Sequence, residues 1–227
     1  MIFIISLTSL NAQNVVNQFD NNGERHGIWT KDYHNTNQKR YQGVFKHGKE
    51  IDTFKYYTLS SGKSVLSALK VFNENDSIAK VTFLASTKKV ISEGQMNGKR
   101  YIGQWIYYHK NATVKMIEEH YNDAGQLEGE RFVYFKDGTI AESANYKNGK
   151  LDGESKWFSK KGTVLRHTHY KDDHLEGKTT NYDTNGNITS EGNYIKSQKK
   201  GIWKYYKQGK LAKEIDHTKQ EVISKQE

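Results

Sequence analysis

Apolar and polar residues alternate with a period of two along short segments of the chain. In the segment GIWKYY, from Gly201 to Tyr206, an extended backbone places Trp203 and Tyr205 on one face. Ile202 and Lys204 then point to the other face. Residues 188–194 alternate in the same way, and nothing comparable to a helical period accompanies them. The pattern predicts β-strands.

Turn sequences separate these predicted strands at short intervals. FKDGT, DTNGN and YKQGK lie within pairs of strands, and KNGK, KHGK and MNGK lie between pairs. Asn-Gly and Asp-Gly supply the positive φ angles of tight hairpin turns. The sequence therefore predicts an all-β chain, folded as an elongated antiparallel β-meander of hairpins in a twisted, single-layer sheet.

Glycine and tyrosine recur with a fixed period in the second half of the chain. The glycines are equally spaced: Gly129, Gly153, Gly177 and Gly201. The tyrosines keep the same step: Tyr146, Tyr170 and Tyr194. Small insertions extend the pattern backwards to opening positions at Gly27, Asp52, Ala79 and Gly103, which gives eight units of similar length. The unit that starts at Ala79 follows the pattern least closely.

Large aromatic residues are expected to stack along one face of the sheet and to supply most of its stability. The expected ladder consists of Trp29, Phe54, Trp105, Phe132 and Trp203. Small residues at Ala144, Thr168 and Gly192 would leave room beside these rows.

The recurring unit resembles the MORN-repeat variant family, whose units read approximately Tyr-x-Asn-Gly-Lys-x-x-Gly-x-Trp-x-x-Tyr. NYKNGKLDG, from Asn145 to Gly153, carries the motif clearly, and the resemblance covers residues 27 to about 217. Asp52 and Ala79 depart from it by replacing the opening glycine. Proteins with such repeats are often labelled YwqK-type antitoxins in bacterial genomes, and the resemblance implies interaction or scaffolding through contacts with proteins and membranes.

The chain divides into four parts on this basis. Residues 1–12, MIFIISLTSLNA, resemble a secretory signal peptide with cleavage after Ala12, although the initial Lys or Arg is missing; the alternative is a buried N-terminal strand. Residues 13–26 form a leader and first strand, 27–217 the repeats, and 218–227 a polar tail. A signal peptide predicts a secreted or periplasmic protein, and its absence a cytoplasmic one. No segment is long enough to span a bilayer as a helix.

Composition limits the chemistry. The 227 residues include no cysteine, which excludes disulfides, thiol nucleophiles and thiolate metal sites. Gly62-Lys63-Ser64 lacks the first glycine of a phosphate-binding loop, and DTNGNITSE, from Asp183, lacks the glycine of an EF-hand loop. His167 and His169 would share a face of a strand as a metal pair, but the repeat favours polar surface residues there. We expect no enzymatic activity, catalytic residue, cofactor or metal.

The chain has a net charge of +9, and part of this positive charge lies in the turns between units. Lysines recur there, and Lys147, Lys150, Lys199 and Lys200 could attract an anionic partner, although neighbouring acidic residues favour a merely solvated edge. The candidate contact residues on an uncovered face are aromatic: Tyr57, Tyr108, Phe135, Phe158 and Tyr206. A protein partner is the leading hypothesis. A toxin, or an anionic lipid or glycan, are the alternatives, and nucleic acid is not expected.

Overall fold

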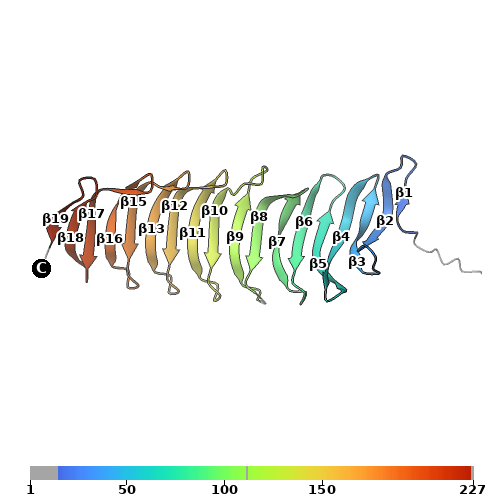
Figure 1. Cartoon of the computed structure of the whole chain (residues 1–227), viewed down its shortest axis with the longest axis horizontal. Coiled ribbons are helices and arrows are strands. Elements are labelled where there is room, and N and C mark those ends of the chain that lie inside the picture. Colours follow the sequence, from blue (N-terminus) through green and yellow to red (C-terminus); the bar gives the residue numbers. More distant parts are fainter. Residues whose placement is uncertain (1–14, 111, 226–227) are drawn as a thin grey trace, which may run out of the picture. The chain divides into compact units, whose positions relative to one another are not determined.

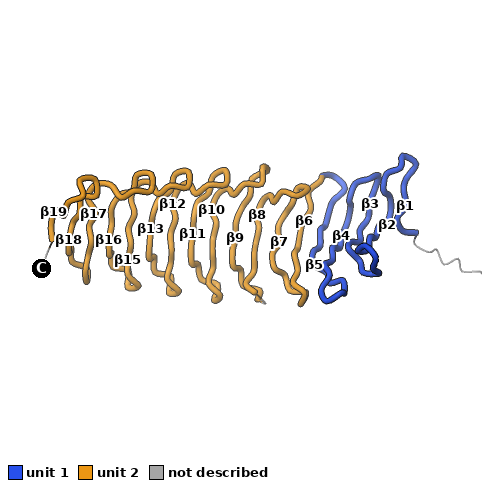
Figure 2. Tube along the Cα trace, in the orientation of Figure 1, with its two compact units in different colours: residues 1–76 blue, residues 77–227 orange. Residues whose placement is uncertain are grey.

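The computed structural model describes residues 15–110 and 112–225, and strands are the only regular elements in these residues (Figure 1). The expected signal peptide lies outside the described residues. The chain divides into two compact units at Asp76 and Ser77, shown in two colours in Figure 2. Each unit is an antiparallel meander, which confirms the predicted fold class.

The first unit contains five strands that pair in chain order. They are β1 (Gln18–Phe19), β2 (Arg25–Asp32), β3 (Lys39–Lys46), β4 (Lys49–Ser60) and β5 (Lys63–Phe72). The side chains of Phe45 and Phe54 are buried and meet edge to face, with ring centroids 5.1 Å apart. Aromatic packing therefore supplies the core of this small unit.

The second unit continues the pattern with fourteen strands. They are β6 (Ile78–Leu84), β7 (Val90–Asn97), β8 (Arg100–Tyr108), β9 (Lys115–Tyr121), β10 (Gly129–Tyr134), β11 (Ile140–Lys147), β12 (Lys150–Phe158), β13 (Val164–Lys171), β14 (His174–Leu175), β15 (Gly177–Tyr182), β16 (Ile188–Ile195), β17 (Gln198–Lys207), β18 (Lys210–Asp216) and β19 (Glu221–Lys225). Each strand packs against its neighbours in the ladder, so the unit is a single layer (Figure 1).

The two faces of the second unit differ in burial. Trp105 and Trp203 are almost fully buried although no second layer covers them within the described residues of the unit. Neighbouring rings cover them instead: Tyr101 stacks on Trp105 with centroids 4.0 Å apart, and Tyr194 meets Trp203 edge to face at 5.1 Å. We call this side the tryptophan face. Its own large side chains form the core of the sheet.

Most opening positions have a left-handed backbone, and Asp52, Gly103, Gly153 and Gly201 lie in bulges. Between β11 and β12, Asn145 alone lies opposite three residues, because the register shifts between the pairs Ala144–Ser155 and Tyr146–Leu151. Gly153, within the bulge, has φ 116°. Seven of the eight predicted opening residues have positive φ, including Asp52 at 57°; the exception is Ala79. Asp52 therefore adopts the backbone of the glycine that it replaces, since aspartate tolerates this region better than most side chains.

The bulge brings the residue two places after it against the preceding strand. The pairs are Phe54 with Gly43, Trp105 with Gly94, and Trp203 with Gly192, and a Cβ on any of these three glycines would collide with the ring. Where the large residue is replaced by Ser155, its partner is Ala144. Ring size on one strand and residue size on the next are therefore matched within a repeat.

Two expectations about the repeat need correction. Phe132 does not occupy the ladder position of Trp105: counting from Gly129, that position belongs to Arg131, which pairs with the carboxylate of Glu119 at 3.2 Å. The predicted polar tail also contains a strand, because Glu221–Lys225 forms β19 and pairs with β18 through Ile215 and Val222. One β-branched pair among polar residues is enough to extend the ladder by this strand.

Candidate interaction surfaces

The turns between repeats form one continuous edge of the second unit, which we call the turn edge. Three of its two-residue turns are Asn148-Gly149, Asp172-Asp173 and Lys196-Ser197, and all six of these residues have positive φ, as type I′ turns require. Each of these turns bonds back along the chain, because its second residue donates its N–H to the carbonyl of the leucine that lies two places before the opening glycine of the same repeat. The bonds run from Gly149 to Leu127, from Asp173 to Leu151 and from Ser197 to Leu175, at 2.8–2.9 Å.

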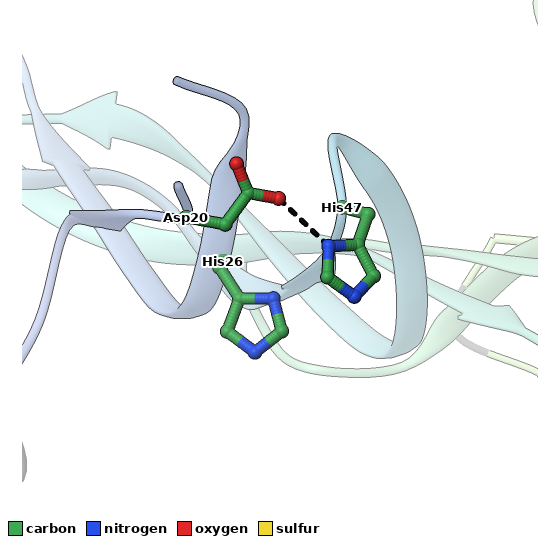
Figure 3. A group of neighbouring side chains, drawn as sticks. All are labelled: Asp20, His26 and His47. Atoms are coloured by element: carbon green, nitrogen blue, oxygen red, sulfur yellow. Dashed lines mark hydrogen bonds and ion pairs between the residues drawn. The ribbon is translucent and has the colours of Figure 1, made fainter. Parts of the chain in front are cut away.

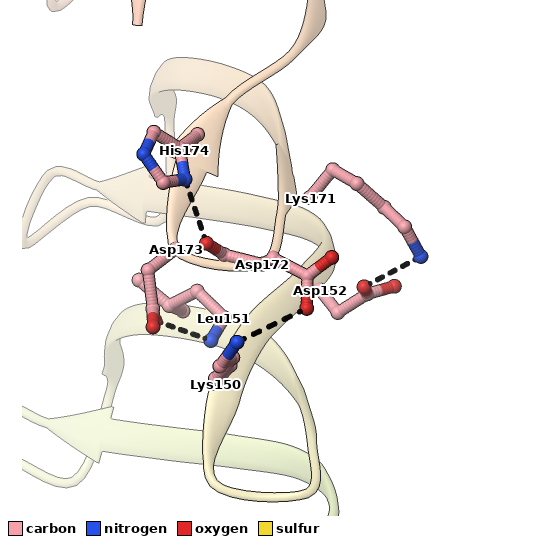
Figure 4. A network of polar contacts seen from close by, with 7 residues as sticks. All are labelled: Lys150, Leu151, Asp152, Lys171, Asp172, Asp173 and His174. Atoms are coloured by element: carbon pink, nitrogen blue, oxygen red, sulfur yellow. Dashed lines mark hydrogen bonds and ion pairs between the residues drawn. The ribbon is translucent and has the colours of Figure 1, made fainter. Parts of the chain in front are cut away.

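Side chains reinforce these main-chain bonds (Figure 4). Asp173 Oδ1 accepts the N–H of Leu151 at 2.8 Å, so that Leu151 both accepts from and donates to the same turn residue. Ser197 Oγ accepts from Leu175 at 3.0 Å in the equivalent place. The recurring Leu-acid-Gly sequence, whose glycine opens a repeat, thus binds the turn near the end of that repeat.

The acidic residue of that sequence has a separate partner. Glu128 Oε2 accepts the N–H of Asn148 at 2.8 Å, and Glu176 Oε2 accepts the N–H of Lys196 at 2.9 Å. Asp152 holds the equivalent place, where a hydrogen bond from Lys171 and the N–H of Asp172 lower the pKa of its carboxyl. These carboxylates therefore satisfy the first N–H of each following turn.

The lysines of the turn edge are interspersed with acids. Lys150 Nζ lies 3.4 Å from Asp172 and Lys171 Nζ lies 2.8 Å from Asp152, both between consecutive repeats (Figure 4). Lys147 is exposed beside them. The mixture of charges is typical of a solvated edge, since exposed ion pairs contribute little energy individually.

Lys199 and Lys200 do not belong to a row of exposed lysines along the turn edge. The ammonium of Lys199 lies 4.2 Å from the Trp203 ring centroid and donates a hydrogen bond to the Tyr205 hydroxyl at 3.2 Å. It therefore belongs to the tryptophan face. Lys200 is half-buried in β17, opposite Asn193.

The opposite side of the second unit carries paired tyrosines and glutamates. Tyr108 donates to Glu93, Tyr134 to Glu118 at 3.1 Å, and Tyr206 to Glu191 at 2.9 Å. We call this side the tyrosine–glutamate face. Hydrogen bonding to Glu93 and burial raise the pKa of Tyr108 to about 12, and burial followed by the bond to Glu118 raises that of Tyr134 to about 12.

Exposed aliphatic side chains lie among these pairs. Ile91 in β7 is 47% exposed and Ile202 in β17 is 51% exposed. Tyr108 also lines a hollow of about 700 Å³ together with Val90 and Val114. This face combines accessible apolar surface with fixed polar groups, as the centre of a protein interface does.

Most of the predicted aromatic contact residues share one repeat position. Tyr57, Tyr108, Phe158 and Tyr206 each lie at the fifth place after an opening position, and all are half-buried. Phe135 is displaced by one place, because Tyr134 occupies the equivalent position and makes the bond to Glu118. The hydroxyl partners on the neighbouring strand could not be predicted without the strand register.

Among the described residues, two groups of side chains have the composition of a metal site. In the first unit Asp20, His26 and His47 converge, with Asp20 Oδ2 2.7 Å from His47 Nδ1 (Figure 3). Asp20 Oδ1 accepts the N–H groups of Asn22 and Glu24, so the carboxylate is already fixed by hydrogen bonds. In the second unit Glu154, His167 and His169 converge across β12 and β13.

None of the described segments forms a helix with the length and apolar character needed to cross a membrane. No curated protein matches the chain. The family model of the MORN repeat variant matches three consecutive segments, residues 127–148, 151–172 and 175–196. Each segment begins at a leucine whose carbonyl accepts the N–H of the turn in which the same segment ends. Residues 127–196 therefore contain three consecutive repeats that match the MORN repeat variant family.

Proposed function

We propose that the protein is a non-enzymatic, exported repeat scaffold that binds a protein partner through the tyrosine–glutamate face of residues 77–227. The observation that supports this most directly is the accessible apolar surface at Ile91 and Ile202 among half-buried tyrosines. Interfaces concentrate their binding energy in aromatic anchors surrounded by such surface. The tryptophan face is a weaker candidate because its largest rings are already buried by their neighbours.

The turn edge supports an electrostatic binding role less well. Its lysines alternate with carboxylates, and the acids Glu128 and Glu176 already accept hydrogen bonds from the turns. Binding to an anionic lipid or glycan would need an uninterrupted positive surface. The net charge nevertheless makes salt dependence worth measuring in the same experiment.

The test is affinity capture from native cell fractions with two matched baits. The wild-type chain is compared with an Ile91→Ser/Ile202→Ser variant, and Val222→Ser, at a 62%-exposed site on β19, serves as the control. We expect a protein that the wild type and Val222→Ser retain and the double variant loses. Equal capture of the protein by all three baits would contradict the proposed face. So would a captured protein that high salt alone releases, because its binding would be electrostatic.

Mass spectrometry of the same samples identifies the partner and the mature N-terminus. A chain that begins at Gln13 supports the export that residues 1–12 suggest. A cytoplasmic chain that retains Met1 contradicts it. A toxin among the captured proteins would favour the antitoxin alternative over a general scaffold.

A further inference from the structure

Three potential ligand atoms meet on the tyrosine–glutamate face at β12 and β13. Glu154 pairs directly with His169 across the two strands, and His167 lies two places before His169 on the same face. His167 Nε2 is 3.4 Å from Glu154 Oε2, and His169 Nε2 is 3.7 Å from Glu154 Oε1. Both histidines therefore turn the same ring nitrogen towards one carboxylate.

The hydrogen bonds around His169 define which nitrogen is available. His169 Nδ1 lies 3.3 Å from the carbonyl oxygen of Lys178, which can only accept, so Nδ1 carries the proton. In the neutral ring the lone pair is then on Nε2. Metal-binding histidines commonly donate their second nitrogen to a carbonyl in this way.

His167 Nε2 has no well-formed hydrogen bond. This atom is shielded from solvent, and its contact with Glu154 Oε2 at 3.4 Å does not meet the geometry of a hydrogen bond. A buried polar nitrogen with so weak a contact is costly. This nitrogen faces the Glu154 carboxylate, so it is placed to bind a cation together with that group.

Two lysines border the cluster. Lys156 Nζ lies 2.7 Å from Glu154 Oε2 and keeps the pKa of this carboxyl low. Lys178 is engaged elsewhere, 3.0 Å from Glu191. An incoming cation would therefore have to displace only Lys156, whose long side chain is flexible and partly exposed.

We propose that Glu154, His167 and His169 form a binding site for a divalent transition-metal ion of the zinc type. Zn²⁺ binds imidazole nitrogen and carboxylate oxygen at about 2.0–2.2 Å, so tetrahedral ligand atoms lie roughly 3.3 Å from one another. His167 Nε2 and His169 Nε2 lie 3.4 and 3.7 Å from the two different oxygens of the Glu154 carboxylate, and the three ligand atoms lie within 4.8 Å of one another, so small side-chain rotations would complete the set. Two imidazoles and one carboxylate leave one coordination position open to water or to a group of the partner.

The other histidine cluster supplies the control. Asp20 and His47 form a hydrogen bond of 2.7 Å, and the second carboxylate oxygen is held by two N–H groups. These atoms are satisfied without a metal. We therefore assign the site to the second unit alone.

The experiment is calorimetric titration of chelator-stripped, full-length protein with Zn²⁺, and with Mg²⁺ for comparison. We expect one Zn²⁺ site that ignores Mg²⁺, with Co²⁺ giving the absorption of a tetrahedral complex. His167→Asn/His169→Asn and Glu154→Gln should weaken binding by more than the ~10–100-fold that loss of an outer partner causes. His26→Asn/His47→Asn should bind as the wild type does.

Three outcomes would overturn the site: no Zn²⁺ binding, unchanged binding by His167→Asn/His169→Asn, or a loss confined to His26→Asn/His47→Asn. Lys156→Met gives a test that does not depend on removing a ligand. Because the competing ammonium is removed, this variant should bind Zn²⁺ more tightly than the wild type. Equal or weaker binding by Lys156→Met would contradict the arrangement.

Discussion

Trp203 lies so close to the main chain of Gly192 that a Cβ on the glycine would collide with the indole ring. Gly192 has no positive φ, so alanine is compatible with its backbone and only the collision opposes it. Gly192→Ala should therefore destabilise the protein by about 1–3 kcal/mol, as overpacked cores do. Chemical unfolding would measure the loss.

The chain contains its own control for this prediction. Ala144 is paired with Ser155 at the equivalent place, so a Trp203→Ser background should accept Gly192→Ala at little further cost. A double-mutant cycle then gives a large coupling energy between the two positions. Equal costs of Gly192→Ala in both backgrounds would show that the ring does not exclude the side chain.

Asp173 combines a left-handed backbone with a bond to the preceding repeat. Asp173→Ala should cost about 1–3 kcal/mol, since it removes the acceptor for the Leu151 N–H and places alanine at φ 68°. Asp173→Asn keeps both properties and should be nearly neutral. Hydrogen exchange should show faster exchange of the Leu151 amide in the alanine variant only; unchanged exchange would exclude the bond.

Lys199 and Lys147 should respond differently to the same substitution. Lys199→Ala removes an ammonium 4.2 Å from the Trp203 ring and should destabilise the fold by about 0.5–2 kcal/mol. Lys147 is exposed, and Lys147→Ala should change stability little. Thermal melts of the two variants provide the comparison, and equal shifts would mean that the cation–ring contact contributes nothing.

Alkaline pH should weaken the tyrosine–glutamate face. The pKa of Tyr108 is raised from 10 to about 12, so its contribution to stability is complete below pH 10. The contribution is lost as pH rises towards 12, because the unfolded chain releases the proton first. Tyr108→Phe should show a shallower fall in melting temperature between pH 8 and 11. Identical slopes would contradict the raised pKa.

In protein kept free of metal by a chelator, acidic pH should lower the stability through protonation of His167. Its pKa lies below the ordinary 6.5, so the stability that it contributes is present above pH 6.5. This stability is lost as pH falls through the folded-state pKa, because the unfolded chain takes up the proton first. His167→Asn should flatten the stability curve over this range. A curve parallel to the wild type would exclude the effect.

The repeat period is sufficient to predict the hairpins and their faces. The positions of Trp105 and Trp203 follow from alternation alone, and the structure buries both. Alternation does not identify Arg131 as the residue at the ladder position, because its neighbour Phe132 is aromatic and fits an aromatic ladder better than a charged residue does. The partner of Arg131, Glu119, comes from another strand, so the ion pair depends on the register.

The surfaces are less accessible to prediction than the fold. Lys199 follows a turn, which suggests a row of turn cations, but the aromatic ring of Trp203 draws its ammonium onto the sheet. Sequence alone does not connect Glu154 to His167 and His169, since it lies on a different strand and meets them only through strand pairing. Contacts across strands require a register that period alone does not specify.

The bonds between consecutive turns also govern how this protein can change in length. Because Gly149, Asp173 and Ser197 each reach back by the same number of positions, a deletion or duplication of one whole repeat would join equivalent docking groups. An insertion of any other size between two turns would separate donor from acceptor. The sheet can therefore be lengthened or shortened by whole repeats, so its length changes in steps of one repeat.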